Sequence, residues 1–120
     1  MNGIINSRVI VAILVVVLAL AVGQLLFKAT AMAWAADRTL FSVRVLSRLL
    51  PSLAIYGFAT LAWIWVLQTV PLRTAYPFMA LAFAFVPLGA YLVFKETVTL
   101  TYWIGTLFIM AGVVITAIAR

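Results

Sequence analysis

The sequence predicts an all-α integral membrane protein whose four transmembrane helices form a small bundle. Of its 120 residues, 68% are apolar and only 8% are charged, and the mean hydropathy is +1.31. A soluble domain is usually about 45–50% apolar and about 25% charged. This composition excludes a soluble enzyme domain, a disordered chain and a disulfide scaffold.

Four uncharged apolar runs define the predicted helices. They cover residues 9–27, 49–70, 74–94 and 97–119. A helix that rises 1.5 Å per residue needs about 20 residues to cross a hydrocarbon core about 30 Å thick, and the runs have that length. In lipid such runs must be helical, because unpaired backbone groups are too costly there.

The first run has a competing interpretation as a secretory signal. Arg8 and the small residues Ala19-Leu20-Ala21 imitate the charged start and the cleavage site of a signal peptide. The apolar run continues to Phe27, however, so we expect a transmembrane helix.

The connections between the runs differ in length. The short links 70–73 and 95–96 predict antiparallel neighbouring helices. In the long connection from Lys28 to Arg48, basic and apolar residues occupy different helical faces. This pattern predicts a short amphipathic helix over 37–48, lying in the membrane interface and N-capped by Asp37.

The net charge of +6 comes from eight lysines and arginines against two acids. Because the bases stand at the ends of the apolar runs, they indicate contact with lipid phosphates rather than with nucleic acid. One side of the predicted bundle carries Lys28, Arg38, Arg44, Arg48 and Lys95, and the other carries Arg8, Arg73 and Arg120. The larger number of bases favours a cytoplasmic location for the side that carries Lys28, with both termini outside. The reverse orientation or a mixed topology stays open.

The chain lacks the groups that most enzymes use. It contains neither His nor Cys, and its acids, Asp37 and Glu96, lie in different loops. We therefore expect no acid–base enzyme, no zinc site and no cofactor. No ionisable residue lies inside a run, which argues against a carrier driven by a buried proton-binding group of its own.

Several polar and aromatic residues inside the runs are candidates for a substrate path. Tyr56 and Trp63 recur at helical spacing, and the amides of Gln24 and Gln68 need partners in lipid. In the third run, Pro77 and Pro87 each remove a backbone hydrogen bond and bend or loosen the helix. This run also places a tyrosine near each end, Tyr76 and Tyr91. The alternative is that these side chains serve only helix packing and the membrane interface.

In the fourth run, Gly105 and Gly112 are seven residues apart. Small residues let helices approach closely in lipid, so this spacing predicts a dimer seam. The alternative is packing within the four-helix bundle.

Four stretches resemble the drug/metabolite transporter superfamily. They are Ala21 to Lys28, Val66 to Pro77, Lys95-Glu96-Thr97 with Trp103-Ile104-Gly105, and Met110 to Val113. The chain is most similar to the small subunits of the undecaprenyl-phosphate-aminoarabinose flippase. This resemblance covers most of the chain outside Thr30 to Arg48.

The resemblance implies movement of a lipid-linked amino sugar across the bacterial inner membrane, for lipid A modification and antimicrobial peptide resistance. It also implies a homodimer, or a heterodimer with a homologous four-helix subunit. The related small multidrug resistance exporters carry a glutamate where this chain has Leu20, which argues against proton-coupled drug export. A quaternary-cation exporter and a non-transporting accessory of a membrane glycosyltransferase stay open as alternatives.

On this hypothesis two groups of residues contact the lipid-linked sugar. The substrate-binding group is Gln24, Lys28, Tyr56, Trp63, Gln68, Tyr76, Tyr91, Lys95 and Glu96. The lipid-phosphate group is Arg38, Arg44 and Arg48.

Overall fold

The structure, a computed structural model, describes residues 6–119. In this range the chain is helical, and no strand occurs. The elements in chain order are α1 (Ser7–Asp37), α2 (Val43–Leu67), α3 (Leu72–Ala75), the 3₁₀ helix η1 (Tyr76–Leu81), α4 (Ala82–Phe94) and α5 (Leu100–Ile118). The described residues contain four helical stretches long and apolar enough to span a membrane, with α3, η1 and α4 forming one of them. The predicted all-α fold with four spans is confirmed.

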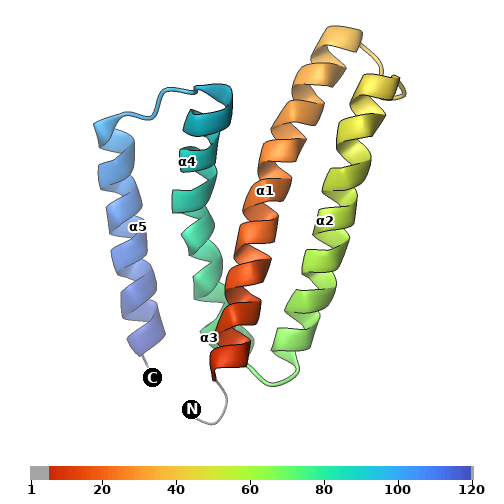
Figure 1. Cartoon of the computed structure of the whole chain (residues 1–120). Coiled ribbons are helices and arrows are strands. Elements are labelled where there is room, and N and C mark those ends of the chain that lie inside the picture. Colours follow the sequence, from red (N-terminus) through yellow and green to blue (C-terminus); the bar gives the residue numbers. More distant parts are fainter. Residues whose placement is uncertain (1–5, 120) are drawn as a thin grey trace.

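The four spans lie beside one another in a flat layer, in the order α2, α1, α4, α5 (Figure 1). The molecule measures 50 × 35 × 18 Å along its principal axes. A helix with its side chains is about 10–12 Å across, so the shortest dimension is less than two helix diameters. The layer is therefore open on its broad faces. Successive spans are antiparallel, as predicted, and α1 and α4 run in the same direction (Figure 1).

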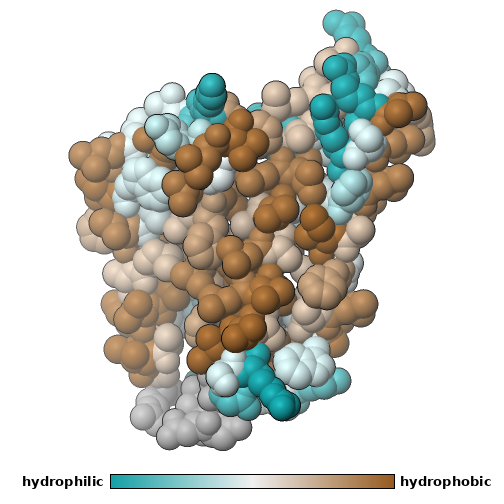
Figure 2. Space-filling model, in the orientation of Figure 1, coloured by the Kyte–Doolittle hydropathy of each residue, from teal (hydrophilic) through white to brown (hydrophobic). Residues whose placement is uncertain are grey.

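The apolar core lies at the end of the layer where α1 begins. Val9, Ile13 and Val17 of α1 are buried there against Val66 and Val70. Elsewhere large apolar side chains cover the outer surface, and Leu107 of α5 is 69% exposed. Figure 2 shows this hydrophobic surface as a band between hydrophilic ends. Such a surface is stable in lipid and not in water.

The predicted interfacial helix over 37–48 is wrong. Helix α1 continues ten residues beyond Phe27 to Asp37, and α2 already begins at Val43. The stretch 29–36 is rich in alanine and contains no Gly or Pro, so nothing in it ends a helix. Helix α1 ends only at Arg38, which adopts the left-handed conformation with φ of 58°.

The predicted capping role of Asp37 is also wrong. The N-cap of α2 is Ser42, whose Oγ accepts a hydrogen bond of 3.1 Å from the Val45 N–H. Asp37 instead accepts a hydrogen bond of 2.7 Å from the Ser42 hydroxyl and forms an ion pair with Arg44. Asp37 therefore fastens the turn between α1 and α2.

The two prolines of the third span behave differently. Around Pro77 the chain leaves the α-helical conformation and forms η1, because proline has no N–H to donate to the preceding turn. Pro87 lies within α4, which continues to Phe94. The expected loosening is thus seen as a local 3₁₀ segment at Pro77.

Candidate functional site

Four polar side chains from α1, α2 and the α4–α5 link form two pairs along α1. We call Gln24, Lys28, Tyr56 and Glu96 the polar cluster. The Gln24 amide donates a hydrogen bond of 2.5 Å to the Tyr56 hydroxyl. Lys28 Nζ lies 3.8 Å from Glu96 Oε2. Gln24 and Lys28 are four residues apart in α1 and so share one helical face.

Gly23 explains how Tyr56 reaches Gln24. A Cβ on Gly23 would lie 2.4 Å from Tyr56 Cε1, so only glycine leaves room for this ring. The ring also stacks on Phe27, with 4.8 Å between the ring centroids. The aromatic contact and the missing side chain together hold α2 against α1 at the level of the polar cluster.

A second glycine lies where α4 packs against α1. A Cβ on Gly89 would lie 2.7 Å from Leu25 Cδ1. Close approach of these helices carries the end of α4 toward Lys28. Lys95 ends α4 in the left-handed conformation with φ of 57°, and Glu96 follows at the Lys28 ion pair.

The Lys28–Glu96 pair is loose. Both side chains are about half exposed, at 52% and 47%. The separation of 3.8 Å exceeds the 2.7–2.9 Å of a charge-assisted hydrogen bond. Such an exposed pair contributes only about 0–1 kcal/mol, so a ligand can replace either partner at little cost.

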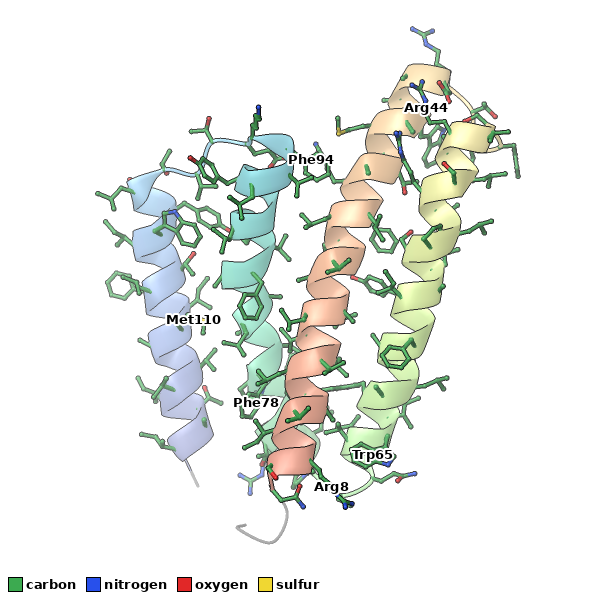
Figure 3. All side chains as sticks on the ribbon, viewed as in Figure 1. Arg8, Arg44, Trp65, Phe78, Phe94 and Met110 are labelled. Atoms are coloured by element: carbon green, nitrogen blue, oxygen red, sulfur yellow. The ribbon has the colours of Figure 1, made fainter. Side chains whose placement is uncertain are left out.

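The other predicted phosphate ligands lie at the same end of the layer. In Figure 3 the labelled residues Arg44 and Phe94 stand at this end, and Arg8 and Trp65 stand at the opposite end. Arg44 is engaged by Asp37, whereas Arg38 lines a shallow cleft with Trp34. Lys28 lies nine residues before the end of α1, which places it about 14 Å below the turn that carries these arginines. Arg120, counted with the opposite charges, lies outside the described residues.

Three predicted substrate residues, Trp63, Gln68 and Tyr76, lie apart from the polar cluster. Trp63 packs against the apolar core. Gln68 follows Tyr56 by twelve residues, about 18 Å along α2, and is exposed there. Tyr76 and Tyr91 are exposed, at 62% and 56%. A single substrate site does not include all of them.

Sequence reasoning missed a cleft beside Glu96. It has a volume of about 290 Å³ and lies between α4 and the start of α5. Its lining residues are Val86, Pro87, Glu96, Thr97, Val98, Thr99 and Tyr102. The signal in the sequence was the run Glu96-Thr97-Val98-Thr99, which places a carboxylate and two hydroxyls directly before an aromatic helix start.

The helix that carries the predicted dimer seam, α5, is exposed along most of its length. A Cβ on Gly105 or Gly112 would meet no described atom within 4 Å. The chain therefore does not use these glycines to pack its own helices within residues 6–119.

The chain is similar in sequence to several known proteins. It is 33% identical over 103 residues to a protein of Proteus mirabilis named probable 4-amino-4-deoxy-L-arabinose-phosphoundecaprenol flippase subunit ArnE. That match covers 86% of this chain and 91% of the relative. The chain belongs to the ArnE family.

Other ArnE family members match shorter stretches at higher identity. The protein of the same name from Enterobacter sp. is 40% identical over 72 residues, covering 60% of this chain and 67% of the relative. The one from Erwinia tasmaniensis is 45% identical over 64 residues, covering 53% of this chain and 59% of the relative. No family model matches the chain, and no solved structure matches it.

The family and the four spans together describe a multi-pass protein of the inner membrane. The resemblance drawn from the sequence motifs is therefore confirmed at the level of the family.

Proposed function

We propose that the chain is a subunit of a flippase that moves an undecaprenyl-phosphate-linked amino sugar across the inner membrane for lipid A modification. The observation that supports this most strongly is the match over 86% of the chain to a protein named as an aminoarabinose-phosphoundecaprenol flippase subunit. Transport, rather than catalysis, is the activity that such a subunit serves.

The shape of the molecule suits a lipid substrate. In an open layer 18 Å thick, a polyprenyl tail stays in the bilayer while only the headgroup follows the protein. The four spans do not need to enclose a sealed pore for this. The helices supply a surface with few polar groups, and Gln24 and Tyr56 form a hydrogen-bonded pair among them.

The basic residues at one end suit an anionic phosphate. Lys28 of the polar cluster and the neighbouring Lys95 are exposed. Arg38, Arg44 and Arg48 lie beyond them near the α1–α2 turn. Lysine and arginine bind phosphates by charge-assisted hydrogen bonds. We assign Lys28 and Lys95 to capture of the lipid phosphate, with the arginines forming the first point of contact.

The test replaces both lysines and measures the lipid that reaches the outer leaflet. We expect Lys28→Gln with Lys95→Gln to lower the labelling of the lipid-linked amine by a membrane-impermeant reagent at least fivefold, because the phosphate loses two cationic partners. Arg73→Gln, which removes a base at the opposite end, is the matched control. Unchanged labelling in the double variant would remove this assignment.

Two further measurements separate the alternatives. A strain without the gene is expected to show the same low labelling and greater sensitivity to polymyxin, while the abundance of the glycosyltransferase that uses the lipid stays normal. A fall in that enzyme's abundance would instead favour the accessory role.

We also propose a partner chain at α5. A subunit by name works with another chain, and α5 presents Gly105 and Gly112 on an uncovered face where a helix of a second four-helix protomer fits closely. The partner is either a second copy or a homologous subunit.

A further inference from the structure

The cleft between α4 and α5 combines an acidic residue with hydroxyl-bearing and aromatic residues. Its lining residues include the acidic Glu96, the hydroxyl-bearing Thr97 and Thr99, and the aromatic Tyr102. By contrast, the groove between α1 and α2 is lined by Leu18, Val22 and Phe58 with other apolar residues. A carboxylate, hydroxyls and an aromatic face form the usual set of groups that binds a sugar carrying an amine.

The size of the cleft limits its occupant. Its volume of about 290 Å³ stands at the lower end of the range of about 300–1,000 Å³ for small-molecule pockets. This volume suits one monosaccharide. The cleft lies where α5 diverges from α4, because α5 makes its contacts with η1 at the other end of the layer.

The Thr99 hydroxyl and the Tyr102 side chain have capacity for a ligand. Thr99 Oγ1 accepts the Tyr102 N–H at 3.1 Å as the N-cap of α5, so its hydroxyl proton stays available to donate. Tyr102 is 44% exposed, and its ring is held edge-on to Trp103 with 5.9 Å between the centroids. Tyr102 is therefore a partly exposed aromatic residue at the cleft.

Glu96 is the acid that can change partners. The other acid, Asp37, is held by both Ser42 and Arg44 at the α1–α2 turn. Glu96 has the loose 3.8 Å contact with Lys28 and also faces the cleft. A ligand that offers a cation to Glu96 and an anion to Lys28 replaces one ion pair by two.

We propose that the cleft binds the ammonium-bearing sugar of the lipid headgroup, with Glu96 as the charge partner of the ammonium and Lys28 released to the phosphate. This inference rests on the proposed function and adds the basis of selectivity. When the sugar of the headgroup is neutral, its phosphate still pairs with Lys28, and Glu96 is left without a cationic partner. Replacement of the Lys28–Glu96 ion pair by contacts with the ligand therefore disfavours binding of lipids that lack the amine.

The experiment compares two lipids in binding to one protein. The full chain, purified from its membrane with any subunit that accompanies it, is placed in nanodiscs. Undecaprenyl-phosphate-linked amino-pentose and the same lipid with its amine acetylated then compete for it, and native mass spectrometry counts each complex. We expect the wild-type protein to prefer the amine-bearing lipid about tenfold, the size expected for one hydrogen bond to a charged group.

The variants assign this preference to Glu96. Glu96→Gln is expected to reduce the preference to within twofold, whereas Glu96→Asp retains most of it because the charge remains. Asp37→Asn, the matched loss of the other carboxylate, is expected to leave the preference unchanged. Tyr102→Ala is expected to weaken binding of both lipids, since both use the ring.

Each result decides between the two proposals. A preference that survives in Glu96→Gln, or a wild-type protein that binds both lipids equally, overturns the assignment of the cleft and leaves the proposed function standing. A wild-type protein that binds neither lipid overturns the proposed function itself. Helicity and nanodisc incorporation equal to wild type show that a variant has folded.

Discussion

Gly23 is the residue on which the polar cluster depends. The Tyr56 ring occupies the space that a Cβ would take, and its hydroxyl meets Gln24 there. Glycine costs a helix about 1 kcal/mol relative to alanine, so its presence inside α1 needs a compensating contact. The stacked Phe27–Tyr56 pair provides one.

We predict that Gly23→Ala destabilises the protein by about 1–3 kcal/mol, because the added methyl group overpacks against the Tyr56 ring. The measurement is unfolding of the purified protein by SDS titration, followed by far-UV circular dichroism. The cost is expected to vanish in a Tyr56→Ala background, where the ring is gone.

Gly57 is the matched control for this substitution. A Cβ on Gly57 meets no described atom within 4 Å, so Gly57→Ala is expected to be neutral or to stabilise α2 by up to about 1 kcal/mol. A Gly23→Ala variant as stable as Gly57→Ala would contradict the close packing of Tyr56 on α1.

At the scale of elements, the α1–α2 hairpin is the firmest part of the layer. It contains most of the buried residues, among them Ile13, Val17 and Val66. Residues 38–42 close it in a turn that Ser42 stabilises from both sides, as N-cap of α2 and as hydrogen-bond donor to Asp37. The hairpin therefore gives the other spans a fixed surface to pack on.

We predict that Ser42→Ala lowers the free energy of unfolding by about 1 kcal/mol, the usual cost of removing a serine N-cap. SDS titration of the purified protein is again the measurement, and Ser47→Ala is the control, because the Ser47 hydroxyl bonds only to the Arg44 carbonyl of its own helix. Equal effects of the two substitutions would show that the cap does not stabilise the hairpin.

At the scale of the whole molecule, the flat layer leaves α5 with little of its surface covered. Thr106 is its buried residue in the described range, while Leu107 and Phe108 are 69% and 73% exposed. Lipid can cover these apolar side chains, but the glycines on the same helix favour a close helix contact. We therefore propose that a second chain assembles with this one at α5.

We predict that Gly105→Leu with Gly112→Leu abolishes assembly while leaving the monomer folded. A Cβ at either position meets no described atom within 4 Å, whereas bulky side chains there keep a partner helix at a distance. Assembly is measured by chemical cross-linking in native membranes, with Leu107→Ala on the same helix as the control. Wild-type cross-linking in the double variant would place the partner elsewhere.

The sequence by itself was sufficient to predict the membrane class, the number of spans and their antiparallel order. These properties depend on the cost of exposing backbone and charge to lipid, and that cost can be judged from the length of each apolar run. The motifs at Val66 to Pro77 and at the end of the first run were likewise sufficient to indicate the family.

The ends of the helices and the contacts between the site residues could be established only from the tertiary structure. Helix α1 continues from Ala29 to Asp37 because this stretch contains no residue that ends a helix, and the hydropathy of the sequence does not predict this extension. The contact of Gln24 with Tyr56 depends on how closely α2 approaches α1 at Gly23, and the contact of Lys28 with Glu96 depends on how α4 packs against α1. Sequence spacing describes the face of one helix, whereas the distance between two helices depends on which side chain occupies the gap between them.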